Sequence, residues 1–453
     1  MIKVQTSVTD TEKIESINLR LEELTNGELE IKRKKGHEWN VKASEFAKKT
    51  TNPIRAIVEH LNVQPNPEKS FIPLSVGDPT VFGNLKAANE TINAVRDAIN
   101  ECKHNGYAHS AGTVVAREAV CKYAAPHQGP LTPDDVILCS GCSSSLDMCI
   151  TVIANPGQNI LIPRPGFSIY RTLATGHDIE VRSYNLLPDK QWQIDLNQME
   201  ALIDENTAAV VLTNPSNPCG SVFSKEHIID IIAVCEKNRV PIIADEIYEH
   251  FVFPNVAYHS ISSLSKNVPV LSCGGLTKRF LVPGWRLGWI TIHDRHDILK
   301  DIRKGLANLS TRILGSNTLV QGALPNILAN TPQTFFDGLV QTLHKHAKLA
   351  FDILKDAQGL KPIMPNGAMY MMIGIEIENF PAYDDELEFV QSLVREQSVF
   401  CLPGKCFDYP NYIRIVLTVP EELIWESCIR IAEFCDKHYK HPFDCDIIEN
   451  LNW

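Results

Sequence analysis

Lys278 has a sequence neighbourhood that suits covalent chemistry. It follows an apolar, small-residue stretch at 271–277, and Arg286 stands eight positions further along the chain. A lysine among apolar residues loses its charge readily, so its amine can form a Schiff base with an aldehyde. The arginine can bind a phosphate through two parallel hydrogen bonds. Although most lysines are solvated surface residues, this pair predicts a Schiff-base lysine beside a phosphate anchor.

Three further segments place polar groups where a predicted buried strand ends. The small-residue segment 140–145 precedes a helix, whose N-terminus favours an anion. Asp245 can pair with a protonated ring nitrogen, and Tyr248 with an oxygen of the same ring. Asn217 lies in a rigid turn with two Asn-Pro steps. Taken singly, these segments could be a helix cap, an acidic strand end and a plain loop; together they favour one ligand site.

The elements that must position these residues alternate along the middle of the chain. Short, nearly continuous apolar runs predict buried strands at 136–138, 159–162, 208–212, 241–244, 269–272 and 287–292. Helices are predicted between them, at 146–153 and 225–238. This pattern is typical of an α/β fold with a mostly parallel sheet covered by helices on both faces.

The chain is long enough for two domains. A helix is expected to open at Asn52-Pro53, and the pattern changes after Thr331-Pro332, where a long helix over 333–355 begins. We therefore predict the following division: an N-terminal arm at 1–42, the first part of a small domain at 43–80, a large domain at 81–332, the second part of the small domain at 333–440, and a tail at 441–453.

Composition excludes several classes of partner and compartment. The chain has 453 residues, 44% of them hydrophobic, and a net charge of −11, so no overall basic field attracts nucleic acid or an anionic membrane. The basic run at 32–35 is interpreted as a solvated segment. Thirteen cysteines in mostly apolar contexts, without a signal peptide or spanning segment, predict a soluble cytoplasmic protein. Cys139 and Cys142 lack a second ligand pair, so no metal is expected.

Several segments of the sequence closely resemble one family of proteins. Residues 52–58, 77–85 and 164–167 are similar to pyridoxal-phosphate-dependent aminotransferases of the aspartate aminotransferase superfamily, class I/II, and the similarity runs from about 52 to 438. The resemblance implies a large domain with a seven-stranded sheet, a smaller α+β domain, pyridoxal 5′-phosphate as cofactor, and a homodimer.

The same resemblance implies roles at the cofactor ring. Lys278 would form the Schiff base and move the substrate's α-proton. Asp245 would pair with the pyridine nitrogen. Tyr248 and Asn217 would bind the ring oxygen, and Phe167 would stack on the ring face.

Further roles concern the phosphate and the substrate. The cofactor phosphate would be surrounded by Gly141, Cys142, Ser143, Thr277 and Arg286. Tyr107 from a second subunit would reach the same phosphate. Arg414 would bind the substrate α-carboxylate, helped by Gly77 and Asn217, although a strand arginine paired at the surface is the alternative. Many relatives have serine where this chain has Gly275, so one phosphate hydrogen bond is expected to be missing.

The implied reaction moves the amino group of L-tyrosine to 2-oxoglutarate, giving 4-hydroxyphenylpyruvate and L-glutamate in tyrosine and phenylalanine catabolism. A lyase, or an aminotransferase of alanine, kynurenine or cysteine conjugates, would use the same residues. A regulator module would need a DNA-binding domain, for which the N-terminal segment is too short. The residues that select the side chain are sought among Val76, Phe82 and the segments near Arg312 and Asn366.

Overall fold

The computed structural model describes residues 39, 41–60 and 63–441. The chain divides into two compact units, Met1–Ser44 and Glu45–Trp453, and the elements below all belong to the second. It opens with the short helix α2 (Glu45–Lys49). The predicted arm with its basic run at 32–35 and the predicted tail lie almost entirely outside the described residues.

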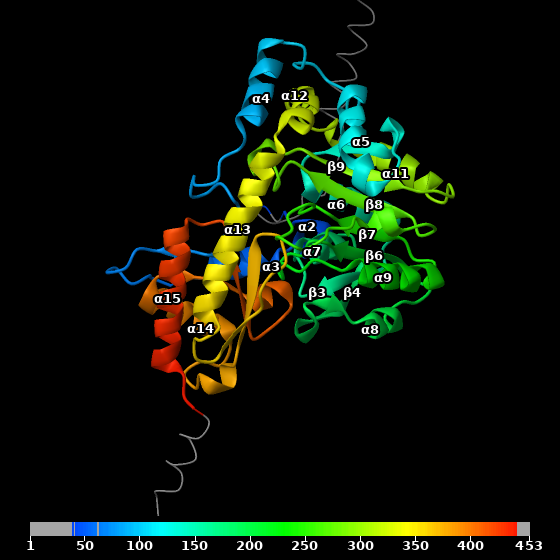
Figure 1. Cartoon of the computed structure of the whole chain (residues 1–453). Coiled ribbons are helices and arrows are strands. Elements are labelled where there is room, and N and C mark those ends of the chain that lie inside the picture. Colours follow the sequence, from blue (N-terminus) through cyan, green and yellow to red (C-terminus); the bar gives the residue numbers. More distant parts are fainter. Residues whose placement is uncertain (1–38, 40, 61–62, 442–453) are drawn as a thin grey trace, which may run out of the picture. The chain divides into compact units, whose positions relative to one another are not determined.

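A sheet of eight strands forms the centre of the second unit (Figure 1). Five neighbouring strands, from β8 to β4, are parallel, whereas β9 and β5 run antiparallel to the strands beside them. The mostly parallel sheet confirms the prediction, with one strand more than the seven expected. The order across the sheet is β2 (Val136–Cys139), β9 (Gly288–His293), β8 (Val270–Gly275), β7 (Ile242–Asp245), β6 (Thr207–Thr213), β3 (Asn159–Arg164), β4 (Glu180–Leu187) and β5 (Gln193–Ile194).

Helices cover both faces of this sheet. Val211 of β6 and Ile243 of β7 belong to an apolar cluster that includes residues of α6 (Cys142–Ile153). Their neighbours in sequence, Val210 and Ile242, belong to a second cluster with residues of α9 (Lys225–Asn238). Because successive strand residues face opposite sides and both sides are covered, the strands are apolar throughout.

Further helices complete this part of the fold. A third apolar cluster at the β2 edge contains residues of α4 (Asn89–Asn100), α5 (Val114–Gln128) and α12 (Thr318–Asn330). The remaining helices here are α7 (Ile169–Gly176), α8 (Leu196–Ala201), α10 (Ile261–Leu264) and α11 (Lys300–Ser310). Throughout the described part of the chain, every helix is too short or too polar to cross a bilayer.

A second, antiparallel sheet is built from the C-terminal part of the chain. Its strands, in order, are β10 (Leu360–Pro362), β11 (Tyr370–Ile375), β14 (Tyr412–Val416) and β13 (Leu402–Pro403). The helices of this region are α13 (Gln333–Leu354), α14 (Glu386–Gln397) and α15 (Glu421–His438). The early strand β1 (Ile72–Pro73) pairs with β12 (Val399–Phe400) and so joins the C-terminal elements. The division into two domains remains a prediction.

Most predicted elements agree with the structure, and the differences have local causes. Helix α9 has the predicted bounds, and α3 (Pro53–His60) begins where expected, because Asn52 Oδ1 accepts hydrogen bonds from the amides of Ile54 and Arg55. Helix α6 begins at Cys142, so its predicted start at 146 is wrong: the small residues form its first turn. Strand β4 was not predicted, because polar residues interrupt its apolar pattern.

Candidate active site

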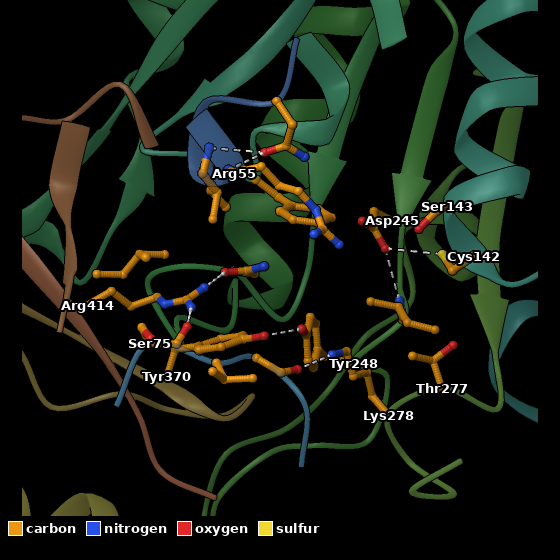
Figure 2. A pocket seen from close by; sticks show the side chains of 18 of the residues that line it. Arg55, Ser75, Cys142, Ser143, Asp245, Tyr248, Thr277, Lys278, Tyr370 and Arg414 are labelled. Atoms are coloured by element: carbon orange, nitrogen blue, oxygen red, sulfur yellow. Dashed lines mark hydrogen bonds between the residues drawn. The ribbon is translucent and has the colours of Figure 1, made fainter. Parts of the chain in front are cut away.

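A cavity of about 430 Å³ lies where the parallel strands end (Figure 2). One side is lined by residues at or just beyond the ends of β2, β3, β6, β7 and β8, among them Ser143, Phe167, Asn217, Asp245 and Lys278. The other side is lined by α3, by residues 75–77, and by Tyr370, Leu402 and Arg414 of the antiparallel sheet. The cavity therefore lies between the two sheets.

The structure brings together nearly all the residues that the sequence singled out. The cavity is lined by Gly77, Cys142, Ser143, Phe167, Asn217, Asp245, Tyr248, Thr277, Lys278, Arg286 and Arg414. Gly141 adjoins them, since a Cβ built on it would lie 2.4 Å from Arg286 Nη2. Tyr107 does not line this cavity and is 91% exposed.

Lys278 presents its amine inside the cavity. Its Nζ donates a 2.6 Å hydrogen bond to the carbonyl oxygen of Gly77 and lies 5.8 Å from the centre of the Tyr248 ring. Because a backbone carbonyl is a neutral partner, the amine is held in position without an ion pair that would have to be broken before it reacts.

Asp245 is a buried carboxylate at the end of β7. Burial raises its pKa, while a hydrogen bond from Tyr170, a backbone hydrogen bond, the Cys142 thiol and the charge of Lys278 partly counteract this. The Tyr170 hydroxyl lies 2.6 Å from Asp245 Oδ2, and the Cys142 sulfur lies 3.7 Å from Oδ1. A buried carboxylate supported in this way is suited to a cationic ring nitrogen. Tyr170 was missed, because no sequence signal connects it with Asp245.

Arg414 is a buried cation on β14, only 3% exposed. Its Nη1 donates to Asn217 Oδ1 at 3.0 Å and its Nη2 donates to the Ser75 carbonyl at 2.8 Å, while its Nε has no partner within the described structure. The interpretation as a surface-paired strand arginine is therefore wrong. A buried guanidinium with a free donor and only neutral partners favours an incoming carboxylate.

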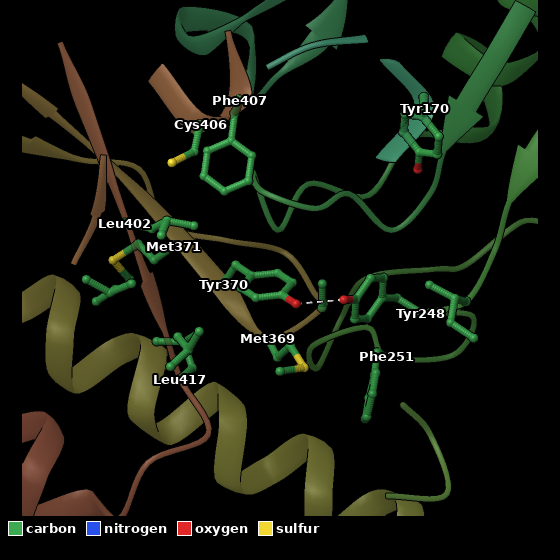
Figure 3. Packing of buried hydrophobic residues seen from close by; sticks show 14 of the residues in the cluster. Tyr170, Tyr248, Phe251, Met369, Tyr370, Met371, Leu402, Cys406, Phe407 and Leu417 are labelled. Atoms are coloured by element: carbon green, nitrogen blue, oxygen red, sulfur yellow. Dashed lines mark hydrogen bonds between the residues drawn. The ribbon is translucent and has the colours of Figure 1, made fainter. Parts of the chain in front are cut away.

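Tyr370 lies between Arg414 and Tyr248 (Figure 2), and Figure 3 shows its hydroxyl pointing toward that of Tyr248. The Arg414 guanidinium lies 4.3 Å from the centre of the Tyr370 ring, and the two tyrosine hydroxyls are 2.7 Å apart. Burial raises the pKa of Tyr248 well above its usual range, so its hydroxyl keeps its proton and can donate it in a hydrogen bond. A Cβ on Gly77 would lie 2.9 Å from the Tyr370 hydroxyl, which explains the glycine. Tyr370 was not predicted.

The end of the cavity near α6 suits an anion. Arg286 donates from Nη2 to the Ser140 carbonyl and from Nη1 to the Pro283 carbonyl, at 3.1 and 3.0 Å. Gly141, with φ of 80°, caps the N-terminus of the twelve-residue α6. The helix dipole and a guanidinium held by neutral carbonyls together suit an anion such as a phosphate.

The outer wall of the cavity was only partly anticipated. Val76 lines the cavity, whereas Phe82, Arg312 and Asn366 do not. Helix α3 contributes Asn52, Ile54, Arg55, Val58 and Glu59. The segment 52–58 was noticed for its resemblance, but no role could be given to it from sequence alone.

The fold and this site define the class of protein. The sequence model of the aminotransferase class I and II family matches residues 69–431, and this chain belongs to that family. It is an aminotransferase that depends on pyridoxal 5′-phosphate. The residues present fit that cofactor: Asp245 is buried and ionisable, Arg286 and α6 form an anion cradle, and Lys278 offers an amine between them.

Particular relatives are similar over most of the chain. Tyrosine aminotransferase of Mus musculus is 56% identical over 402 residues, which cover 88% of each protein. Tyrosine aminotransferase of Homo sapiens has the same identity and coverage. The crystal structure of tyrosine aminotransferase from Leishmania infantum superimposes with a TM-score of 0.86 at 33% identity, covering 89% of this chain and all of that one.

Proposed function

We propose that this enzyme transfers the amino group of L-tyrosine to 2-oxoglutarate, giving 4-hydroxyphenylpyruvate and L-glutamate, in tyrosine and phenylalanine catabolism. The observation that carries the proposal is the buried Arg414, which lines the cavity and has only neutral hydrogen-bond partners, so its charge suits a carboxylate. The apolar residues Ile54, Val58, Val76 and Leu402 line the same cavity and suit an aromatic ring. The substrate named for the similar mammalian enzymes supports the same choice.

In this proposal the chain holds the cofactor at three places. Pyridoxal 5′-phosphate supplies an aldehyde and an electron-accepting ring. Arg286 would hold the phosphate together with Gly141, Cys142, Ser143 and Thr277. Asp245 would hold the ring nitrogen in its protonated form, Tyr248 and Asn217 would donate to the ring oxygen, and Phe167 would stack on the ring.

The same residues position the substrate. Arg414 would bind the α-carboxylate with its guanidinium, while Asn217 and the backbone at Gly77 limit where the carboxylate can lie. Lys278 Nζ, held near the Gly77 carbonyl before substrate binds, would be the base that takes the α-proton of the substrate.

A substrate panel tests the proposal. The purified holoenzyme is incubated with 2-oxoglutarate and, separately, tyrosine, phenylalanine, alanine or kynurenine, and glutamate and the 2-oxo acid product are measured. Tyrosine should give the highest kcat/KM and equal amounts of glutamate and 4-hydroxyphenylpyruvate. A higher kcat/KM for alanine or kynurenine would overturn the substrate assignment.

The lyase alternative makes a different prediction in the same assay. A lyase would cleave a sulfur amino acid and release ammonia and a 2-oxo acid without forming glutamate from 2-oxoglutarate. That result, together with no glutamate from tyrosine, would replace aminotransfer by elimination.

Two further proposals concern assembly and location. A homodimer is proposed because Tyr107 is exposed and does not line the cavity of its own chain, so its side chain is available to a second subunit. A cytoplasmic location is proposed because every described cysteine has a free thiol, including Cys149 and Cys273, whose sulfurs are 3.7 Å apart without a bond. Fractionation of cells followed by an activity assay tests the location.

A further inference from the structure

A second group of polar side chains lies beside the active site but takes no part in it. His127, near the end of α5, and Glu249 and His250, just beyond β7, bring one potential metal ligand atom each to within 4.8 Å of one another. His127 Nε2 lies 3.1 Å from Glu249 Oε2, and the two imidazole rings have centres 4.5 Å apart. Two imidazoles and one carboxylate are a donor set that zinc accepts, with a fourth position left for water.

Tyr258 packs against the same group. Its ring centre lies 5.2 Å from that of His250, so the imidazole is held by an aromatic neighbour.

The group can be reached from outside. His250 and Arg279 line a separate cavity of about 430 Å³, whose other wall is formed by Gln333, Asp337 and Gln341 of α13. Arg279 donates to the Tyr123 hydroxyl at 2.6 Å and lies over the Phe336 ring. Its positive charge opposes a cation, so the site should bind and release zinc rather than hold it permanently.

We propose that His127, Glu249 and His250 form a reversible zinc site. Zinc would take the place of the hydrogen between His127 Nε2 and Glu249 Oε2, and the imidazole proton would move to Nδ1, so no net proton is released. Glu249 directly follows Tyr248, and Arg279 directly follows Lys278. Occupation of the site would therefore shift both active-site segments and lower kcat.

The test uses tag-free holoenzyme freed of metal with a chelator. Zinc is titrated in competition with a chromophoric chelator, and cobalt is titrated separately to record the visible bands of a tetrahedral site. About one zinc per chain should bind, and His250→Asn and His127→Gln should each weaken binding by at least about tenfold. The matched control is His296→Asn, which removes an exposed histidine whose ring is hydrogen-bonded to Asn267 and should leave zinc affinity unchanged.

Activity provides a second readout of the same proposal. Zinc should lower kcat of the unaltered enzyme and of His296→Asn, and should have no effect on His250→Asn at the same zinc concentration. Each variant is compared with itself with and without zinc, after circular dichroism has verified its fold. Equal zinc binding by all variants, no binding by the unaltered enzyme, or equal inhibition of His250→Asn would overturn the proposal.

Discussion

At the scale of single residues, the site is built from charged groups that the protein itself does not neutralise with an opposite charge. Arg414 and Arg286 are held by carbonyl and amide oxygens, and Lys278 by a backbone carbonyl. Such arrangements hold the cations in place and keep their charge available for a ligand. Asp245 is the corresponding buried anion. Three predictions at this scale follow from these contacts.

Replacing Lys278 by alanine should lower turnover by at least about a thousandfold, because the base and the covalent attachment are both lost. Turnover and the visible absorbance of the bound cofactor are measured together. Lys266→Ala, at an exposed lysine, is the control and should behave as the unaltered enzyme. An unchanged absorbance in Lys278→Ala would place the attachment at another lysine.

Replacing Arg414 by lysine should raise KM for both substrates by about tenfold or more, because an ammonium cannot form the two parallel hydrogen bonds. Steady-state kinetics with tyrosine and with 2-oxoglutarate measure this. Arg395→Lys makes the same change at an exposed position of α14 and should leave KM as it was. If KM is the same in both variants, Arg414 does not bind the substrate.

Replacing Tyr170 by phenylalanine should change the pH dependence. Burial raises the pKa of Asp245, and the Tyr170 hydrogen bond favours the ionised carboxylate. Activity needs the ionised form, so it falls as the pH drops through this pKa. Without the hydrogen bond the pKa of Asp245 is higher. The fall of kcat/KM on the acidic side of its pH profile should therefore occur about one pH unit higher.

The control for this experiment is another buried tyrosine. The Tyr184 hydroxyl donates to the Val211 carbonyl at 2.7 Å and lies outside the cavity. Tyr184→Phe should cost some stability but leave the acidic side of the pH profile where it is. If kcat/KM of Tyr170→Phe and of the unaltered enzyme falls at the same acidic pH, this hydrogen bond does not control the pKa of Asp245.

At the scale of elements, the carboxyl ends of the parallel strands gather the cofactor-facing residues, and the close packing of β8 against β9 shapes the phosphate end. A Cβ on Gly275 would lie 2.9 Å from both Gly288 Cα and the Leu287 carbonyl oxygen. Glycine at position 275, where many relatives have serine, is therefore explained by the close contact of two backbones.

Replacing Gly275 by serine should consequently destabilise the enzyme by about 1–3 kcal/mol, because the strands must separate. Urea denaturation measures the free energy of unfolding. Gly284→Ser is the control, since a Cβ there would meet nothing within 4 Å. A Gly275→Ser enzyme that is as stable as its control and binds the cofactor more tightly would show that the serine can be accommodated.

At the scale of the whole molecule, one active site joins distant parts of the chain and, in our proposal, two chains. If Tyr107 acts on the phosphate of a second subunit, a hybrid of one Lys278→Ala chain and one Tyr107→Phe chain contains one intact site. Such hybrids should regain the cofactor affinity that Tyr107→Phe homodimers lose. Light scattering should give twice the chain mass of 50.7 kDa.

The affinity for pyridoxal 5′-phosphate is measured in mixed and unmixed samples, with unmixed Tyr107→Phe as the reference. If hybrids are no better than this reference, Tyr107 does not act across an interface. A single-chain mass in solution would contradict the homodimer itself.

The sequence by itself determined the parallel sheet and the principal site residues. Strands that are buried on both faces are apolar throughout, so their limits can be predicted from the sequence. The carboxyl ends of parallel strands lie at the same edge of the sheet. That reasoning placed Asp245, Asn217, Lys278 and the segment 140–145 together. The resemblance to a family added Arg414 and the cofactor.

Only the tertiary structure decided which side chains support these residues. Tyr170 beside Asp245 and Tyr370 beside Tyr248 are joined by contacts between residues 75 and 122 positions apart. The same holds for His127 and Glu249, 122 positions apart, which no spacing rule for metal ligands would have connected. Local periodicity records which face of an element is buried, but the partner on the facing element is fixed only when the elements pack.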